Sequence, residues 1–310
     1  MSEGLPYAGD IVDAHHHVWR QADMPWLSGP MVPRIFGPYE PIRRDYPIEE
    51  YRDDARSAGI GTSVYVQPNW PMDRVVDEVR WIAELHERTG WPMAMVGCVD
   101  MFAEDAVEVM RVQREISPLV VGTRLQLHWH ERPEWRFADG PDRMKDPVFR
   151  RNIAALRDLG WLFELQVFAG QMHDAAALVA DNPDVPFVLV HAGMLTDHTD
   201  PSTVDEWRAG MRELAACPNV VVKLTGQGTF VHEVDEGLIR FVTDEVLRDF
   251  GSTRAMFGTN LPVEKLWTSA ADLTDAWRTA LIDRTPDEQA DVFSRTARRV
   301  YGLPDAPTAP

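Results

Sequence analysis

The chain is poor in cysteine and in basic residues, and it has no long apolar run. Two cysteines among 310 residues, Cys98 and Cys217, are too few for a disulfide framework and lack the spacing of metal ligands. Lysine and arginine number 31 against 49 acidic residues, and the formal charge of -18 argues against a nucleic-acid groove, which normally needs clustered basic residues. No apolar run reaches the roughly eighteen residues of a membrane span. No Gly-rich phosphate loop follows a strand candidate, which argues against nucleotide binding.

These absences favour a soluble globular protein that acts on a small molecule. The N-terminus has no basic segment followed by an apolar stretch, so we expect a cytoplasmic protein without a membrane partner. Because the protein is acidic overall, an anionic substrate would need local positive charge in the site. Barrels of the kind predicted below commonly form homo-oligomers, although no stretch of this sequence identifies an interface.

Eight short apolar runs recur along the chain, and most precede a longer stretch with helical spacing of its apolar residues. We predict strands at residues 10–17, 61–67, 93–99, 119–127, 161–167, 186–191, 219–224 and 254–260. Amphipathic stretches such as 73–89 and 147–159 predict the returning helices. The strands are apolar enough to be buried on both faces, which favours a parallel sheet covered by helices. The count of eight favours a closed (β/α)8 TIM barrel over an open doubly wound sheet.

One domain accounts for the whole pattern. No internal repeat, low-complexity segment or Gly/Ser linker divides the chain, so we predict a single barrel domain over residues 1–303. The segment 18–47 is rich in proline and tryptophan and too long for an ordinary connection, which predicts a loop over the barrel mouth. The tail PDAPTAP, residues 304–310, is expected to be disordered.

Three histidines stand side by side in the segment IVDAHHHVWR near the start of the chain. Alternate side chains of an extended strand share a face. We therefore expect Asp13 on the same face as His15 and His17, with Ala14 and His16 on the other. Only two of the three histidines can then act together.

The carboxyl ends of barrel strands carry the chemistry in this type of fold, and here those ends are polar. They supply His15, His17, Gln67, Arg124, Gln126, His128, Glu164, Gln166, His191, Lys223 and Asn260. A single histidine at the rim usually has a structural role, but three imidazoles from the first and sixth strands would meet at the mouth. Neutral histidines are common zinc ligands, and a bound cation polarises a carbonyl or acidifies a water.

Six motifs in fixed order give a family resemblance. They are DAHHHVW, VGTRLQ, LVHAGM, VVVKLTG, MFGTNLPVEKL and ARRVYGL. Together they resemble the amidohydrolase-related TIM-barrel hydrolases, and within them the branch of sugar lactonases and 2-pyrone-4,6-dicarboxylate lactonase. The resemblance covers nearly the whole chain.

The resemblance implies roles for particular residues. His15 and His17 match the family's His-x-His pair, and His191 matches its sixth-strand histidine. Asn260 stands where many members have an aspartate that binds metal or acts as general base. A neutral amide cannot be that base near pH 7, so Asn260 is expected to orient water or substrate. The general base is left unassigned, with three reserve carboxylates: Glu264, Asp197 and Glu164.

The resemblance leaves two variants of the chemistry open. In the first, His15, His17 and His191 hold one divalent ion, zinc or manganese, whose water attacks a carbonyl. In the second, no metal binds and the histidines polarise the carbonyl by hydrogen bonding, as in the family's metal-independent lactonases. The missing anionic ligand favours the second variant slightly. A binuclear site is not expected, because the fifth strand has no histidine and the fourth no bridging lysine.

Arg124 is the main candidate for substrate binding, because its planar fork suits a carboxylate. The alternative for Arg124, and for Lys223, is an ion pair with Glu164 inside the barrel. Gln67, Gln166 and His128 are further candidates that could reach the substrate. Four tryptophans that follow strand ends could wall a pocket for a ring-shaped substrate, namely Trp19, Trp70, Trp129 and Trp267.

The sequence thus predicts a hydrolase that opens a lactone carrying a carboxylate or several hydroxyls. One alternative is a metal-dependent decarboxylase or hydratase of aromatic or unsaturated carboxylic acids, because related barrels use a similar set of histidines. A second alternative is a barrel that binds a ligand without turning it over, which the missing aspartate suggests.

Overall fold

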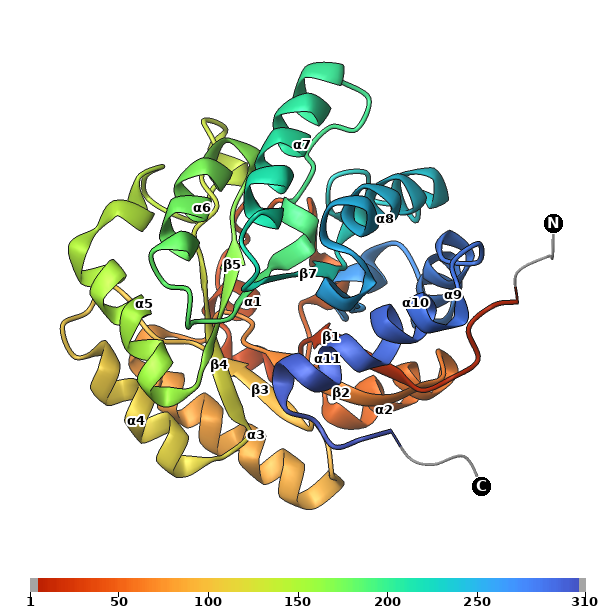
Figure 1. Cartoon of the computed structure of the whole chain (residues 1–310). Helices are drawn as coiled ribbons and strands as arrows, with labels where there is room; N and C mark the ends of the chain where they lie inside the picture. Colours follow the sequence, from red (N-terminus) through yellow and green to blue (C-terminus); the bar gives the residue numbers. More distant parts are fainter. Residues whose placement is uncertain (1–4, 307–310) are drawn as a thin grey trace.

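Eight parallel strands form a single sheet in chain order, with helices around it (Figure 1). The structure is a computed structural model that describes residues 5–306. The strands are β1 (Ile11–His16), β2 (Ile60–Val66), β3 (Ala94–Gly97), β4 (Val120–Gln126), β5 (Leu162–Gln166), β6 (Phe187–Leu189), β7 (Val220–Leu224) and β8 (Ala255–Phe257). Each overlaps one of the predicted ranges.

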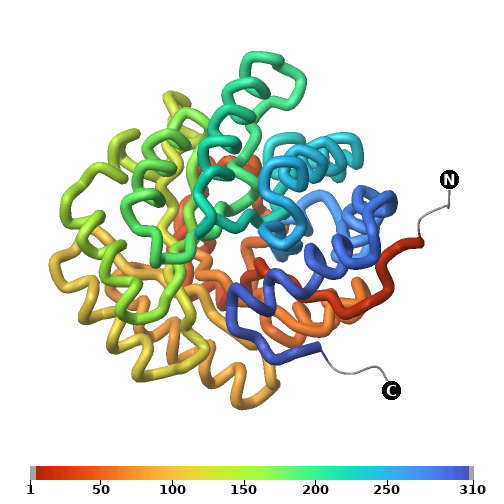
Figure 2. The backbone as a smooth tube through the Cα atoms, in the orientation of Figure 1, coloured from red at the N-terminus to blue at the C-terminus, as the bar shows by residue number. Residues whose placement is uncertain are grey.

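The sheet closes into a barrel between β8 and β1. The backbone N–H groups of Asn260 and His17 donate to the carbonyls of His15 and Leu261, each over 2.7 Å. Figure 2 shows the consequence, with the N-terminal strand in red beside the C-terminal part of the chain in blue. The predicted (β/α)8 barrel is therefore confirmed.

Helices follow the strands on the outside of the barrel. They are α2 (Ile48–Ser57), α3 (Val75–Thr89), α4 (Ala106–Ile116), α5 (Pro147–Leu159), α6 (Met172–Ala180), α7 (Pro201–Ala215), α8 (Glu236–Phe250), α9 (Ala270–Ala280), α10 (Pro286–Ala290) and α11 (Thr296–Tyr301). The predicted helices at 73–89 and 147–159 correspond to α3 and α5. The bounds of α5 follow from its capping residues. The Asp146 carboxylate accepts the N–H groups of Val148 and Phe149 at the start of the helix, and Gly160 ends the helix in the left-handed conformation.

The barrel interior has an apolar part and a polar part. Small and branched residues such as Val12, Val64 and Val188 form the apolar part, and Tyr301 of α11 packs among them. Helix α11 covers the amino end of the barrel, because Arg298 pairs with Asp10 just before β1 at 2.8 Å. Towards the carboxyl ends, the interior becomes polar, with Arg124, Glu164 and Lys223 all buried. The polar residues that line the cavity described below therefore lie at the carboxyl end of the barrel.

A β-bulge in β1 changes the expected facing of its side chains. The register with β2 shifts between Asp13 and His16, so that Ala14 lies in the apolar interior and His15 also points inward, next to Lys223. Asp13 instead reaches the outer layer, where it accepts the Tyr51 hydroxyl of α2. The expectation that Asp13 shares a face with His15 and His17 is therefore wrong, because simple alternation fails across a bulge.

The segment 18–47, here called the mouth segment, contains the short helix α1 (Pro25–Ser28) and contributes Trp26, Arg34 and Phe36 to the cavity described below.

The domain limits of 1–303 stay a prediction, since residues 1–4 lie outside the described part. Residues 304–306 are exposed and have no regular secondary structure, and 307–310 also lie outside it, so the disordered tail stays a prediction. Between residues 5 and 306, each helix is too short or too polar to cross a membrane.

One buried acid gives a prediction about stability. Glu78 of α3 is fully buried, its Oε1 accepts the Tyr65 hydroxyl at 2.7 Å, and its Oε2 has no partner. Burial raises the pKa of Glu78 to about 8. The folded state therefore binds this proton more tightly than the unfolded state, so stability is lost as the pH rises from the ordinary carboxyl range through about 8.

We expect Glu78→Gln, which cannot ionise, to lose less stability than the wild type between pH 6 and pH 9. Thermal unfolding across this range measures the effect. Glu84→Gln on the exposed face of the same helix is the matched control and should follow the wild-type curve. Parallel curves for Glu78→Gln and the wild type would contradict the prediction.

Candidate active site

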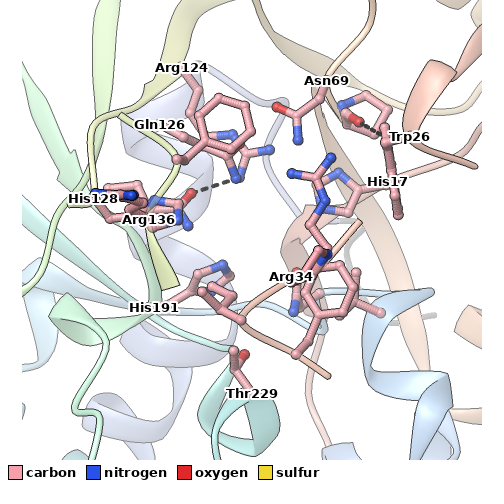
Figure 3. A pocket seen from close by; sticks show the side chains of 18 of the residues that line it. His17, Trp26, Arg34, Asn69, Arg124, Gln126, His128, Arg136, His191 and Thr229 are labelled. Carbon is pink, nitrogen blue, oxygen red and sulfur yellow. Dashed lines mark hydrogen bonds between the residues drawn. The ribbon is translucent and has the colours of Figure 1, made fainter. Parts of the chain in front are cut away.

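A cavity that is open to solvent lies at the carboxyl ends of the strands (Figure 3). Residues at the barrel rim form its inner part, namely His17, Arg124, Gln126, Gln166, His191 and Asn260. Connecting segments form its outer part, including Trp26, Arg34, Phe36, His128, Arg136 and Phe137. The cavity thus combines an imidazole and amide floor with a wall of arginines and aromatic rings.

The three predicted histidines converge beneath this cavity. The ring centroid of His15 lies 5.1 Å from that of His17 and 4.9 Å from that of His191. His17 and His191 line the cavity, whereas His15 is fully buried behind them. His16 stacks on Tyr51 outside the barrel, at 3.7 Å between centroids. The prediction that only two histidines of the run act together is consistent with this arrangement.

All three imidazoles are neutral at neutral pH. Burial, with help from the nearby cations Arg124 and Lys223, holds the pKa of His15 and of His191 well below the ordinary range. The same causes lower the pKa of His17 to about 3. His17 Nδ1 lies 2.6 Å from the Val66 carbonyl oxygen, which can only accept, so Nδ1 carries the proton and Nε2 keeps a lone pair.

A left-handed turn after β6 places His191. Four successive residues, from His191 to Met194, have positive φ angles, a conformation that non-glycine residues rarely adopt. The ring of His191 then lies against Gly226, where a Cβ atom would come within 2.4 Å of Nδ1. The glycine of the VVVKLTG motif is therefore needed for the histidine to fit.

The histidines do not form a ready metal centre. Between residues 5 and 306, no group of three His, Cys, Asp or Glu side chains is placed to hold a metal ion. Buried nitrogens without partners are present, at His15 Nε2 and His191 Nδ1. However, the Lys223 ammonium lies 3.3 Å from His15 Nδ1, and Asn260 offers only a neutral amide. A divalent cation at the histidines would therefore lie close to the Lys223 ammonium, and the carboxylate nearest to that ammonium, Glu164, is already paired with it.

Arg124 is buried at the cavity and has no acidic partner in the described chain. Its guanidinium donates to the Gln67 carbonyl and to Gln166 Oε1, the latter over 3.3 Å, and its Nε has no partner. The alternative pair between Arg124 and Glu164 does not form. Glu164 pairs instead with Lys223, at 2.5 Å, which is the alternative predicted for that lysine. Arg124 is therefore available to an anion.

Two further arginines face the same cavity (Figure 3). Arg34 of the mouth segment lies over the Trp26 ring at 5.3 Å, and its Nε is buried without a partner. Arg136 comes from the connection after β4. Glu134 also lines the cavity, but Arg132 holds its carboxylate at 2.8 Å. The cavity is thus positive within a protein whose formal charge is -18.

Sequence reasoning missed Arg34, Arg136 and Trp26. The length and composition of the mouth segment predicted that it lies over the barrel mouth. They did not single out Arg34, because arginines in long connections are usually solvated.

The other predicted site residues divide between the cavity and its support. Trp19, His128 and Gln166 line the cavity. Gln67 lies behind it, where its Oε1 accepts the backbone N–H of Asn69 at 2.6 Å. Trp70 packs 5.8 Å from Trp81, away from the main cavity.

Of the three reserve carboxylates, Glu264 is the one that accepts a hydrogen bond from a described residue lining the cavity. Its Oε1 lies 3.4 Å from Asn260 Nδ2, and its Oε2 accepts the Trp267 indole N–H at 2.7 Å. Burial raises the pKa of Glu264 to about 7. Asp197 lies in an exposed turn away from the cavity, and Glu164 is engaged by Lys223.

Comparisons with known proteins agree over nearly the full chain. A family model described as amidohydrolase matches residues 12–303. An L-fucono-1,5-lactonase of Burkholderia multivorans is 30% identical over 311 residues, which cover 95% of this chain and 96% of that protein. A crystal structure of an amidohydrolase from the same species, with bound zinc, is 28% identical with a TM-score of 0.80, covering 95% of this chain and 99% of that one. The 2,6-dihydroxybenzoate decarboxylase from Rhizobium shares only the fold, at 14% identity and a TM-score of 0.63 over 95% of this chain and 98% of that one.

Proposed function

Because the chain belongs to the amidohydrolase family, we propose that it is a hydrolase that opens a lactone carrying a carboxylate. Family membership confirms the resemblance carried by the six motifs, and with it the expectation of an enzyme. The lactonase relative supports a cyclic ester as the substrate. The observation that carries the proposal is the unpaired Arg124, joined by Arg34 and Arg136, beside neutral imidazoles in an acidic protein.

The arginines select for a carboxylate on the substrate. Arg124 offers a planar set of donors at the inner end of the cavity, and bidentate recognition of a carboxylate is the interaction that such a fork suits. Arg34 and Arg136 raise the local potential at the entrance. A neutral, polyhydroxylated lactone would leave the buried charge of Arg124 without a counterion, so the carboxylated class is favoured.

The ring opening itself requires water activation and a proton for the leaving alcohol. The oxygen of water bonds to the carbonyl carbon, the ring C–O bond breaks, and the proton that water gives up is returned to the alkoxide. We assign the proton-accepting position to His17 Nε2, whose lone pair is fixed by the bond from Nδ1 to Val66. A substrate carboxylate beside Arg124 neutralises one of the charges that hold the pKa of His17 low, and so strengthens this base.

Asn260 positions the attacking water. An ionised Glu264 accepts from the Asn260 amide nitrogen, which leaves the amide oxygen to accept a hydrogen bond from water in the cavity. Glu264 is thus a positioning residue rather than the base. Asn260 adopts a positive φ of 59°, and the closure between β8 and β1 holds it there.

The test compares matched substrates. We expect hydrolysis of a lactone with a free carboxylate, and a loss of about tenfold or more in kcat/KM for the methyl ester of that carboxylate, since a charge-assisted hydrogen bond contributes about 1.5–3 kcal/mol. Equal rates for acid and ester would contradict the role of the arginines.

The same experiment separates the alternatives. Release of CO2 from aromatic carboxylates, with no lactone opened, would favour the decarboxylase alternative and overturn the proposal. Ligands that raise the melting temperature but are never turned over would favour the binding protein.

A further inference from the structure

A buried polar chain runs from the amino end of the barrel to the histidines, and the proposed function does not use it. The Tyr301 hydroxyl of α11 donates to Glu164 Oε1 at 2.8 Å. The same oxygen accepts from Lys223 Nζ at 2.5 Å, and Nζ lies 3.3 Å from His15 Nδ1. Glu164, Lys223 and His15 have no exposed surface. In a buried chain of hydrogen bonds, each contact needs one atom that donates the hydrogen and one that accepts it.

The ion pair decides which atom donates at His15. A lysine with no access to water is stable as a cation only beside an anion, and Glu164 supplies that anion in direct contact. An ammonium has three N–H donors and no lone pair. In the contact between Lys223 and His15, nitrogen Nζ must therefore donate and Nδ1 must accept.

The proton of the His15 ring then sits on the other nitrogen. A ring protonated on both nitrogens would direct an N–H at the ammonium, 3.3 Å away, so the ring is neutral with its one hydrogen on Nε2. In the described chain, that Nε2 is buried and has no hydrogen-bond partner. His17 has the opposite tautomer, because its Nδ1 donates to Val66.

We propose that Lys223 is a positioning residue that fixes the His15 hydrogen on Nε2 and thereby closes this buried nitrogen to a metal ion. A metal would need a lone pair on Nε2, and Lys223 removes it.

The inference separates this chain's histidines into two roles. At Nε2, His17 keeps a lone pair and His15 carries a hydrogen, although both belong to one His-x-His motif. In this chain the deciding residue is Lys223, which lies 208 positions away in the sequence.

Nitrogen NMR of histidine-labelled, metal-free protein tests the tautomer directly. We expect the His15 signals of the wild type to show the hydrogen on Nε2 and those of His17 to show it on Nδ1, with Lys223→Met used to assign His15. A His15 ring protonated on Nδ1 in the wild type would overturn the proposal.

Zinc affinity is the second readout. The double variant Lys223→Met/Glu164→Gln removes both charges of the buried pair, so it avoids leaving one of them unpaired. We expect it to bind zinc at least about tenfold more tightly than the wild type, measured by competition with a chromophoric chelator. Tyr301→Phe, which keeps the contact between Lys223 and His15, is the matched control and should keep the wild-type affinity and tautomer.

Unchanged zinc affinity in the folded double variant would overturn the inference, as would a Tyr301→Phe control that gains zinc to the same extent. Neither readout needs a substrate. Failure of every lactone to react would therefore count against the proposed function and leave these two measurements valid.

Discussion

Replacing Arg124 with methionine is expected to lower kcat/KM for a carboxylated lactone by about 10²- to 10³-fold, the range for removing one partner of a buried charge pair. Arg124 is 3% exposed, lines the cavity and has no acidic partner in residues 5–306, so its charge is left for the substrate. Methionine keeps much of the side-chain volume but cannot donate. The loss should be much smaller for the methyl ester of the same lactone, which presents no charge to the missing guanidinium.

Testing the variant on both the acid and the ester distinguishes a lost contact with the carboxylate from a general disturbance of the site. Arg151→Met on α5 is the matched control, because Arg151 is 53% exposed, pairs with Glu104 on the surface and does not line the cavity. It should leave kcat/KM unchanged. If Arg124→Met lost equal factors on the acid and on the ester, the arginine would act on the fold of the site and not on the carboxylate.

Replacing Asp13 with alanine is expected to lower the free energy of unfolding by about 3–5 kcal/mol and to abolish activity. The Asp13 carboxylate accepts four hydrogen bonds in a fully buried place. Its Oδ1 accepts the backbone N–H groups of His15 at 3.0 Å and Thr259 at 2.8 Å. Its Oδ2 accepts the hydroxyls of Thr259 at 2.6 Å and Tyr51 at 2.9 Å. Alanine would leave two backbone donors buried without partners.

Asparagine at this position distinguishes the hydrogen bonds from the charge. In Asp13→Asn the amide oxygen still accepts the two backbone N–H groups, and the amide nitrogen can donate to the two hydroxyls. We therefore expect a loss of only about 1 kcal/mol and recovery of most of the activity. Urea unfolding measures both variants. An Asp13→Ala protein within about 1 kcal/mol of the wild type would show that the bulge does not depend on this carboxylate.

Much of the architecture could be predicted because it follows from local patterns. Strands buried on both faces are continuous apolar runs, and amphipathic helices such as α5 have caps that can be recognised in the sequence. The meeting of His15, His17 and His191 followed from the rule that strand ends converge at the barrel mouth.

What could not be predicted depends on geometry that no local pattern records. The bulge in β1 breaks the alternation that seemed to pair Asp13 with His15. The choice of partner for Glu164 depended on which of two inward cations lay nearer, and only the folded barrel shows that it is Lys223. Arg34 became a cavity residue through the path of a long connection, which its composition does not determine.

The seam between β8 and β1 also bears on the order in which the protein assembles. The hydrogen bonds that Thr259 donates to Asp13 join residues 246 positions apart. This contact therefore closes a far longer loop than the pairing of neighbouring strands does. Loop-closure entropy favours the short-range pairs β2 to β3 or β4 to β5 early in folding and delays the seam. Because His15 and Asn260 lie on the two sides of that seam, catalytic competence should be the last property the chain acquires when it folds, and the first it loses when the barrel opens.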